Sequence, residues 1–361
     1  MRFAPPNPLR IADRASGLNA PSVRSYNERL VLSLLLQNEG ISRLEIGVRT
    51  GLSAQTVSVI VRSLEQEGLV AKGEAQRGRV GPPTIPLSLN PEGAYSVGVS
   101  FGARAADIVL IDFVGKIRRH TTHPFAALRA SDALLPPIGQ VLMSGAAGAT
   151  KRIAGIGLAV PDDATTSEDV QAVLGLDFAE AQRRIEREFQ QPVFIQNDIT
   201  AAAGGECLFG AARPLSDFVF FYLGSSLHSR LILNHQIYNG NAGGRYTAGL
   251  APLREALSSC DVTLEGLASV DRLPRTAQHA YDAWRRDCCG TIADAVGSLL
   301  SFVGVKSLVL STYAPPTVSE AIAAALVAAL PGITVLVGHN SAAPKAVGAA
   351  SLPYHSRLMV Q

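Results

Sequence analysis

The sequence predicts an α/β protein in which a short helical segment precedes a much larger domain of alternating strands and helices. Apolar residues recur at helical spacing between residues 24 and 66, which is typical of amphipathic helices. Beyond residue 89, β-like runs alternate with helical stretches after an opening meander, and this pattern indicates a mixed-sheet α/β fold. Hydrophobic residues make up 47% of the 361 residues and charged residues 17%, so most of the chain is expected to fold around buried cores.

Residues 1–23 are rich in proline, alanine, serine and asparagine without periodicity, so we expect a flexible arm. The opening residues lack the apolar region of a signal peptide. No apolar run reaches the roughly 20 residues that span a bilayer. These features predict a cytoplasmic protein with no membrane partner. The cysteines show neither metal-ligand nor disulfide spacing and are expected to be buried: Cys207, Cys260, Cys288 and Cys289.

The sequence pattern of residues 24–88 predicts three helices followed by a hairpin. The first helix begins near Arg24 and is closed by Glu39-Gly40. The second opens on a capping box, in which the Ser42 hydroxyl and the Glu45 carboxylate each accept a hydrogen bond from a free backbone N–H. It stops at Gly51, and Ser53 caps the third helix. The third helix carries a buried stripe at i, i+3, i+4 and i+7 spacing, formed by Val57, Ile60, Val61 and Leu64.

Two short helices separated by a glycine-containing turn predict a helix-turn-helix. Opposite the buried stripe of the third helix lie polar side chains that could read base edges or contact phosphates. These candidate DNA-binding residues are Ser53, Gln55, Thr56, Ser58 and Arg62. The alternative interpretation is an ordinary solvated helix face.

The segment after the third helix favours DNA binding. Arg77 and Arg79 flank a glycine between two short β-like runs, and such a basic hairpin tip suits a wing that contacts the DNA backbone or minor groove. Residues 1–90 carry 11 Lys and Arg against 7 Asp and Glu, whereas the remainder carries 21 against 23. The positive surplus therefore lies on the part predicted to contact double-stranded DNA.

These motifs resemble the DNA-binding end of the ROK family (repressor, open reading frame, kinase). The resemblance rests on Arg24-Ser-Tyr-Asn-Glu-Arg-Leu-Val-Leu, Ser42-Arg-Leu-Glu-Ile, Thr50-Gly-Leu-Ser-Ala-Gln-Thr-Val-Ser and Arg77-Gly-Arg. Gly47 departs from the Ala that is common in the family, at a cost of up to about 1 kcal/mol to the helix.

Residues 89–361 resemble the ROK domain throughout. Strands are expected at 95–100, 107–113, 153–160, 193–196, 218–223, 231–233, 307–310 and 333–337, and helices at 131–145, 178–190, 200–209, 277–302, 318–330 and 342–350. The resemblance implies a two-lobed, actin-like and hexokinase-like (ribonuclease H-like) fold with an interlobe cleft. The expected domains are the arm at 1–23, a winged helix-turn-helix at 24–88 and the ROK domain at 89–361.

The nucleotide-binding motifs of ROK kinases are degraded in this sequence. Ser100 replaces the Asp of the first phosphate loop, while Ala103 and Arg104 replace its second Gly and its Thr. The glycine-rich second loop reads Gly224-Ser-Ser-Leu-His-Ser-Arg230, and the adenosine-side glycines read Ser311-Thr-Tyr. Side chains at these positions obstruct the close approach of backbone to phosphate. We therefore expect neither ATP as a cofactor nor any catalytic residue.

The sugar-side motifs are partly retained. The resemblance places Asn197-Asp198 where kinases of the family hold the carboxylate that faces the sugar, with Asn241 and Asp162 on neighbouring loops. Two bland interpretations stay open: Asn197-Asp198 caps the following helix, and Asp162-Asp163 forms a solvated loop. Gly244 and Thr247 replace the sugar-contacting Glu and His, and the zinc motif has no counterpart, so no metal is expected.

The resemblance implies a transcriptional regulator, expected to repress carbohydrate uptake or catabolism genes. A sugar effector would bind the candidate residues Asn197, Asp198, Asn241 and Asp162, and a homodimer or homotetramer would read a palindromic operator. Two alternatives are an active ATP-dependent sugar kinase and a regulator whose ROK domain serves only for oligomerisation.

Overall fold

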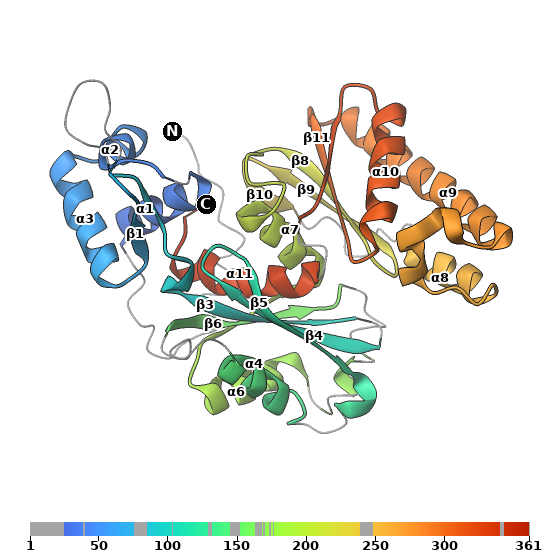
Figure 1. Ribbon diagram of the computed structural model, residues 1–361, viewed down its shortest axis with the longest axis horizontal. Coiled ribbons are helices and arrows are strands. Elements are labelled where there is room, and N and C mark those ends of the chain that lie inside the picture. Colours follow the sequence, from blue (N-terminus) through green and yellow to red (C-terminus); the bar gives the residue numbers. More distant parts are fainter. Residues whose placement is uncertain are drawn as a thin grey trace. The chain divides into compact units, whose positions relative to one another are not determined.

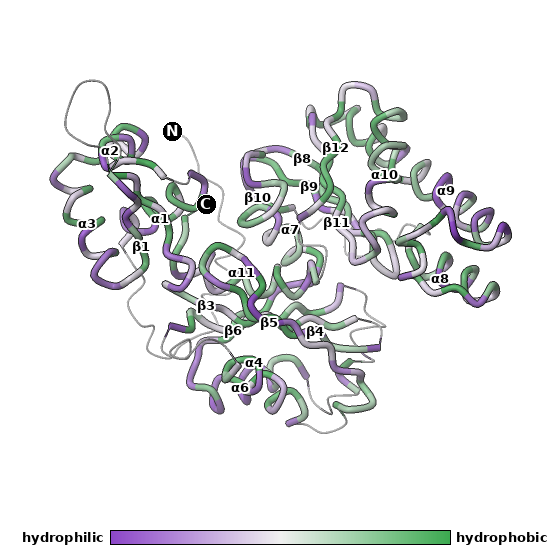
Figure 2. The backbone as a smooth tube through the Cα atoms, in the orientation of Figure 1, coloured by the Kyte–Doolittle hydropathy of each residue, from purple (hydrophilic) through white to green (hydrophobic). Residues whose placement is uncertain are grey.

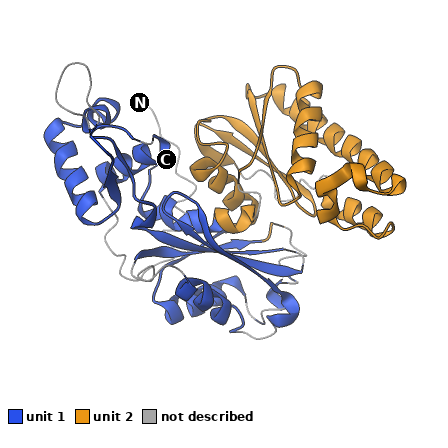
Figure 3. Ribbon diagram, viewed as in Figure 1, with its two compact units in different colours: residues 1–160, 165–196, 349–361 blue, residues 161–164, 197–348 orange. Residues whose placement is uncertain are grey.

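The computed structural model describes residues 25–38, 40–75, 85–102, 104–128, 132–144, 152–162, 168, 170–172, 175, 177–238, 248–339 and 343–360. The chain divides into two compact units, each with its own five-stranded sheet (Figure 3). The first unit comprises residues 1–160, 165–196 and 349–361, and the second comprises 161–164 and 197–348.

The first unit begins with the predicted helix-turn-helix (Figure 1). Ser42 and Glu45 form the predicted capping box, and Gly51 ends the second helix at φ 71°, a left-handed conformation that favours glycine. An antiparallel strand pair follows, in register Val70 to Leu89. The elements are α1 (Tyr26–Gln37), α2 (Arg43–Thr50), α3 (Ala54–Gln66), β1 (Val70–Lys72) and β2 (Leu87–Leu89).

The rest of the first unit is a five-stranded sheet in the order β5-β4-β3-β6-β7. Helices α4 and α6 cover one face and α11 lies on the other (Figure 1). Strands β3 and β6 pair in parallel at its centre, and β5 is an edge strand. The elements are β3 (Tyr95–Phe101), β4 (Ala105–Asp112), β5 (Ile117–Pro124), β6 (Ile153–Val160), β7 (Val193–Asn197), α4 (Leu135–Ser144), α6 (Phe178–Phe189) and α11 (Pro344–Arg357), with short 3-10 turns at Pro91–Gly93 and Phe125–Ala127.

The second unit holds a five-stranded sheet in the order β10-β9-β8-β11-β12. Helices α8, α9 and α10 pack with one apolar cluster of this sheet, and α7 packs with another. The elements are α7 (Asp198–Phe209), β8 (Phe218–Leu223), β9 (Leu227–Leu233), β10 (Gln236–Tyr238), α8 (Leu250–Ser258), the 3-10 segment Leu264–Arg272, α9 (Arg275–Leu300), β11 (Ser307–Thr312), α10 (Pro316–Ala329) and β12 (Thr334–Val337).

Apolar residues concentrate in the central strands, as the hydropathy colouring in Figure 2 shows. Every residue of β3 and of β8 is buried, as expected for strands that carry layers of side chains on both faces. The predicted α/β class is confirmed. In the described part of the chain, no helix is long and apolar enough to cross a membrane.

Several predicted boundaries were wrong. The strand expected at 231–233 begins at Leu227, and the helix expected at 342–350 continues to Arg357. The helix expected from 131 begins at Leu135. Strand β5 was not expected because its sequence is mostly polar, as suits an exposed sheet edge, and α8 and β10 were also missed.

Candidate functional site

The helix α3 presents the candidate DNA-binding side chains. Gln55, Ser58 and Arg62 are exposed on one side of the helix, whereas the stripe at 57, 60, 61 and 64 is buried. Val59 lies on the same side as these three polar residues and is 64% exposed. An exposed apolar side chain beside Gln and Arg suits contact with a thymine methyl group in a major groove.

Ser53 and Thr56 have a local structural role. The Ser53 hydroxyl accepts the Thr56 N–H at 3.2 Å and lies 2.9 Å from the Thr56 hydroxyl. This pair caps α3. Ser53 is exposed and Thr56 half-buried, so any phosphate contact would add to the capping role.

The single acidic side chain within α3 is neutralised by cations. Arg43 lies 3.1 Å from the Glu65 carboxylate and Lys72 lies 2.8 Å from it. These pairs leave no uncompensated negative charge within α3 to repel a polyanion. Arg77 and Arg79, the candidate residues of the wing, lie outside the described residues.

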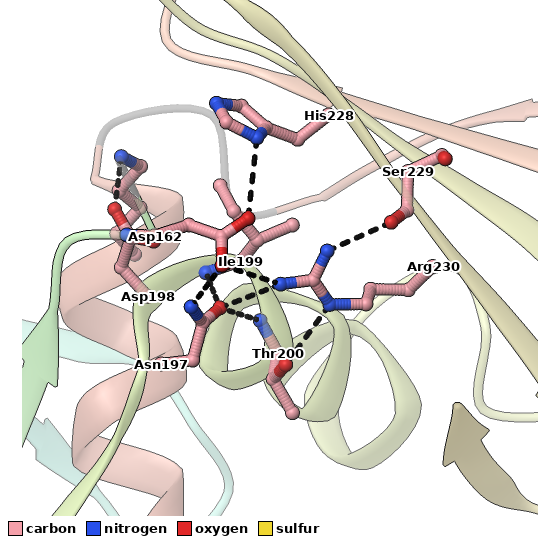
Figure 4. Close-up of polar contacts among 9 residues, drawn as sticks. Asp162, Asn197, Asp198, Ile199, Thr200, His228, Ser229 and Arg230 are labelled. Carbon is pink, nitrogen blue, oxygen red and sulfur yellow. Dashed lines mark hydrogen bonds and ion pairs between the residues drawn. The ribbon is translucent and has the colours of Figure 1, made fainter. Parts of the chain in front are cut away.

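A second polar cluster forms in the second unit, around the predicted Asp162, Asn197 and Asp198 (Figure 4). The Arg230 guanidinium, 6% exposed, lies 3.2 Å from the Asp162 carboxylate. It also donates to Asn197 Oδ1 at 2.8 Å and to the Thr200 hydroxyl at 3.0 Å. His228 Nδ1 lies 3.3 Å from the other oxygen of Asp162.

Asn197 connects this cluster to α7. Its Oδ1 accepts the backbone N–H groups of Ile199 at 3.0 Å and Thr200 at 3.1 Å, which is the N-cap interaction. Its Nδ2 donates to the Asp162 carboxylate. The capping interpretation of Asn197 is therefore correct, and the same side chain also belongs to the cluster.

Asp198 is held by two partners within the second unit. Its Oδ1 accepts the Asp162 backbone N–H at 2.9 Å, and its Oδ2 pairs with the Lys345 ammonium. The Lys345 ammonium also lies 5.0 Å from the centroid of the Tyr222 ring, within the range of a cation–π contact. Asp198 is 2% exposed, so a ligand that bonds this carboxylate must compete with Lys345.

The charges of the cluster are matched. The pKa of Asp162 lies well below its usual range, mainly because His228 donates a hydrogen bond to the carboxylate. The charge of Arg230 and the hydrogen bonds from Arg230 and Asn197 lower this pKa further, whereas burial opposes the shift. The Asp162 side chain is 11% exposed. The solvated-loop interpretation of this residue was therefore wrong, and Asp163 lies outside the described residues.

Residues at the positions that the resemblance assigns to nucleotide binding take part in the protein's own packing. Ser100 is buried within β3, opposite Asp107 of β4. The Thr312 hydroxyl donates to the Leu223 carbonyl at 2.7 Å, which ties β11 to β8. Arg230, at the end of the altered second loop, reaches into the Asp162 cluster.

Asn241, Gly244 and Thr247 lie outside the described residues. Among the residues that are described, no group of three or more His, Cys, Asp or Glu side chains is placed to hold a metal ion. Cys260 and Cys288 are free thiols. Burial raises the pKa of the Cys288 thiol to about 12, so this thiol is a poor metal ligand at neutral pH.

Sequence reasoning missed Arg230, His228, Thr200 and Lys345. Arg230 could have been found, because it directly precedes the apolar strand run Leu231-Ile-Leu233, and a charged residue that enters a buried strand needs a partner. Lys345 gave no comparable signal. It lies 147 residues from Asp198 and stands in an ordinary helical pattern.

Comparisons with known proteins match both the N-terminal helix-turn-helix and the larger domain that follows it. A family model for winged helix-turn-helix DNA-binding matches residues 24–71, and the ROK family model matches residues 96–283. The latter match covers more than half of the chain. This chain belongs to the ROK family. The predicted resemblance and the predicted fold class are thereby confirmed.

Individual ROK proteins include both regulators and kinases. The xylose repressor of Bacillus spizizenii is 27% identical over 229 residues, which are 61% of this chain and 59% of that protein. A ROK family transcriptional regulator, a homolog of the Escherichia coli Mlc protein, has a similar fold with TM-score 0.59, 16% identity and coverage of 91% and 96%. A ROK family glucokinase from Streptomyces griseus, solved in complex with glucose and AMPPNP, has a TM-score of 0.54 and 14% identity. That comparison covers 72% of this chain and 99% of the glucokinase. The last two likenesses show the fold alone, and the alignment with the repressor spans under two thirds of that protein.

Proposed function

We propose that this ROK protein is a DNA-binding transcriptional repressor of carbohydrate uptake or catabolism genes, and that it has no enzymatic activity. The observation that carries the proposal is the exposed polar face of α3, with Gln55, Ser58 and Arg62 around Val59. Gln and Arg offer paired donors or acceptors to base edges, and Val59 offers an apolar surface to thymine. Because helix-turn-helix proteins bind DNA as symmetric dimers, we propose a homo-oligomer on a palindromic operator.

The effector of this repressor is proposed to be a sugar or a sugar derivative at the Asp162, Asn197 and Asp198 cluster. Carboxylate and amide oxygens accept hydrogen bonds from sugar hydroxyls. The name of the xylose repressor relative supports a pentose among the first compounds to test. Asn241 is proposed as a further contact, and Arg77 and Arg79 as wing contacts to DNA. The cytoplasm is the proposed compartment, because the DNA is there.

An active kinase is the less favoured function. It would need Mg-ATP, yet the residue at the Asp position of the first phosphate loop is the buried Ser100, which has no carboxylate for a hydrated cation. We expect no ATP hydrolysis in the presence of sugars. Turnover of ATP with any sugar would overturn the proposal that the chain is not an enzyme.

A regulator with no small-molecule ligand is the second candidate. It is favoured by one observation: Asp162 and Asp198 are already paired with Arg230, His228 and Lys345. A site whose carboxylates are internally neutralised gives a sugar less to gain, because the ligand must replace these partners.

The decisive experiment is binding of the purified full chain to its own upstream intergenic DNA, measured by fluorescence anisotropy at two salt concentrations. D-xylose, D-glucose and their phosphates would be added to the complex. We expect specific, salt-sensitive binding, which one of these sugars weakens. Specific binding that no sugar changes would favour the second candidate, and no preference over unrelated DNA would contradict the repressor function.

A further inference from the structure

Helix α11 belongs to both units of the protein. Its residues up to Gly348 cluster with the second unit, and its residues from Ala349 onward cluster with the first. On the second unit, a Cβ atom at Gly348 would lie 2.2 Å from the Ala201 carbonyl oxygen of α7. On the first unit, the carbonyl oxygen of Ala349 would lie 1.9 Å from a Cβ atom at Gly157. Each end of α11 is therefore packed closely against the backbone of its own unit.

The N-terminal end of α11 carries Lys345 in its first turn. A cation there is opposed by the positive end of the helix dipole, so its pairing with Asp198 offsets an unfavourable interaction. The Lys345 side chain is 21% exposed and Asp198 is 2% exposed. A ligand that takes over the Asp198 carboxylate therefore leaves the Lys345 cation without its carboxylate partner at the start of α11.

The C-terminal end of α11 is capped by the first helix of the DNA-binding domain. Arg29 of α1 donates from Nε to the Met359 carbonyl at 2.8 Å and from Nη2 to the His355 carbonyl at 3.1 Å. The last carbonyls of a helix receive no hydrogen bond from within the helix, and a guanidinium can donate to them. Ser33, also on α1, accepts the Val360 N–H at 2.8 Å and donates to the Val360 carbonyl at 3.1 Å.

The last turn of α11 is held in place by contacts with the first unit. Arg357 donates to the Ala154 carbonyl of the central sheet at 2.6 Å. Tyr354 is fully buried, and its hydroxyl lies 3.3 Å from the Ala94 carbonyl. The four hydrogen bonds that Arg29 and Ser33 form, as described above, therefore join α1 to this helix end.

We propose that α11 couples the Asp198 cluster to the DNA-binding domain, because Lys345 holds its first turn to Asp198 while Arg29 and Ser33 hold its last turn to α1. A neutral polyol whose hydroxyl groups donate hydrogen bonds to the Asp198 carboxylate displaces Lys345. Loss of this ion pair loosens the first turn of α11. Loosening of α11 then weakens the hydrogen bonds that Arg29 and Ser33 of α1 form with its C-terminal end. The coupling is reciprocal, so binding of DNA by the winged domain alters the affinity of the cluster for the polyol by the same factor.

This inference rests on the proposed function only for the identity of the ligand, and its first test needs no ligand. Backbone hydrogen exchange of the full chain would be compared for wild type, Lys345→Met and Lys306→Met. Met keeps the length of the Lys345 side chain and removes its charge. Lys306 is an exposed lysine of the second unit and serves as the matched control. We expect faster exchange in residues 26–37 and 358–360 of Lys345→Met, by about 5-fold or more, and no change in Lys306→Met.

The opposite end of α11 supplies the second variant. Arg29→Gln removes the guanidinium from the Met359 and His355 carbonyls, and reciprocity predicts faster exchange in residues 198–203 and 344–348. Ser33→Ala is a milder change at the same end if Arg29→Gln folds poorly. Exchange in α1 that is identical in wild type and Lys345→Met would overturn the coupling.

D-xylose and D-glucose then separate the coupling from the proposed function. A sugar that protects residues 198–203 should change exchange in α1 of wild type and leave α1 of Lys345→Met unaltered. Protection at 198–203 without any change in wild-type α1 would overturn the coupling. If neither sugar protects 198–203, their role as effectors is contradicted, and the two variants alone decide on the coupling.

Discussion

The guanidinium of Arg230 and the carboxylate of Asp162 lie 3.2 Å apart and are both largely buried. The same guanidinium bonds to Asn197 and Thr200, so one side chain of β9 connects the Asp162 loop with the start of α7. Kinases of the family hold a glycine-rich phosphate loop in this stretch, according to the resemblance. Arg230 therefore supplies an internal cation to the cluster.

Loss of Arg230 should destabilise the fold. The change Arg230→Met leaves the Asp162 carboxylate without its strongest nearby charge, and breaking a buried ion pair by removal of one partner costs about 3–5 kcal/mol. We expect the free energy of unfolding, measured by urea denaturation, to fall by about that amount. Arg183→Met is the control, because Arg183 is 62% exposed in its pair with Glu180 and should cost at most about 1 kcal/mol. Equal effects of the two variants would contradict the structural importance of the cluster.

The pKa of Asp162 predicts a pH dependence of stability. Because this pKa is lowered in the folded state, mainly by the His228 hydrogen bond, the unfolded chain takes up a proton first as the pH falls. The stabilisation is therefore complete above the ordinary Asp pKa of about 4 and is lost below it. Asp162→Asn should reduce the free energy of unfolding at pH 7 by about 1–3 kcal/mol, and the difference from wild type should shrink as the pH falls below about 4. Asp132→Asn, at a 64% exposed side chain, is the matched control and should change the free energy of unfolding at pH 7 by at most about 1 kcal/mol.

Two exposed side chains of α3 should determine operator affinity. Gln55→Ala and Arg62→Ala should each weaken binding to the upstream DNA by about 1–3 kcal/mol, or 5- to 150-fold in Kd. Their helix content should not change, because both side chains are exposed and outside the buried stripe. A loss for Arg62→Ala that is equal on all DNA sequences would assign this residue to phosphate rather than to a base. Affinities unchanged for both variants would place the DNA interface elsewhere.

Local signals made the N-terminal domain predictable. The capping box of Ser42 and Glu45, the stop at Gly51 and the Ser53 cap each depend on residues within one turn, so the sequence alone contains the interaction. The strands Ile153–Val160 and Phe218–Leu223 also match their predicted limits, because continuous apolar runs between polar turns are typical of buried strands.

Interactions between distant residues were not predictable in this way. Asp162, Arg230 and Lys345 meet their partners only through the packing of β9, α7 and α11. The extent of α11 was underestimated for a related reason. Pro353 removes the N–H that would bond the Ala349 carbonyl, and that carbonyl packs on Gly157 while the helix continues to Arg357.

Gly157 and Gly290 should respond with opposite signs to the same substitution. A methyl group at Gly157 would lie 1.9 Å from the Ala349 carbonyl oxygen, which is backbone and has no room to move aside. Gly157→Ala should therefore lower the melting temperature strongly, with a loss of at least about 1–3 kcal/mol by overpacking. At Gly290, in the middle of α9, a methyl group meets nothing within 4 Å. Gly290→Ala should raise stability by up to about 1 kcal/mol, because Ala restricts the unfolded chain and favours helix. Thermal unfolding of the two variants beside wild type tests both signs, and a stable Gly157→Ala would show that α11 is not seated against β6 as described.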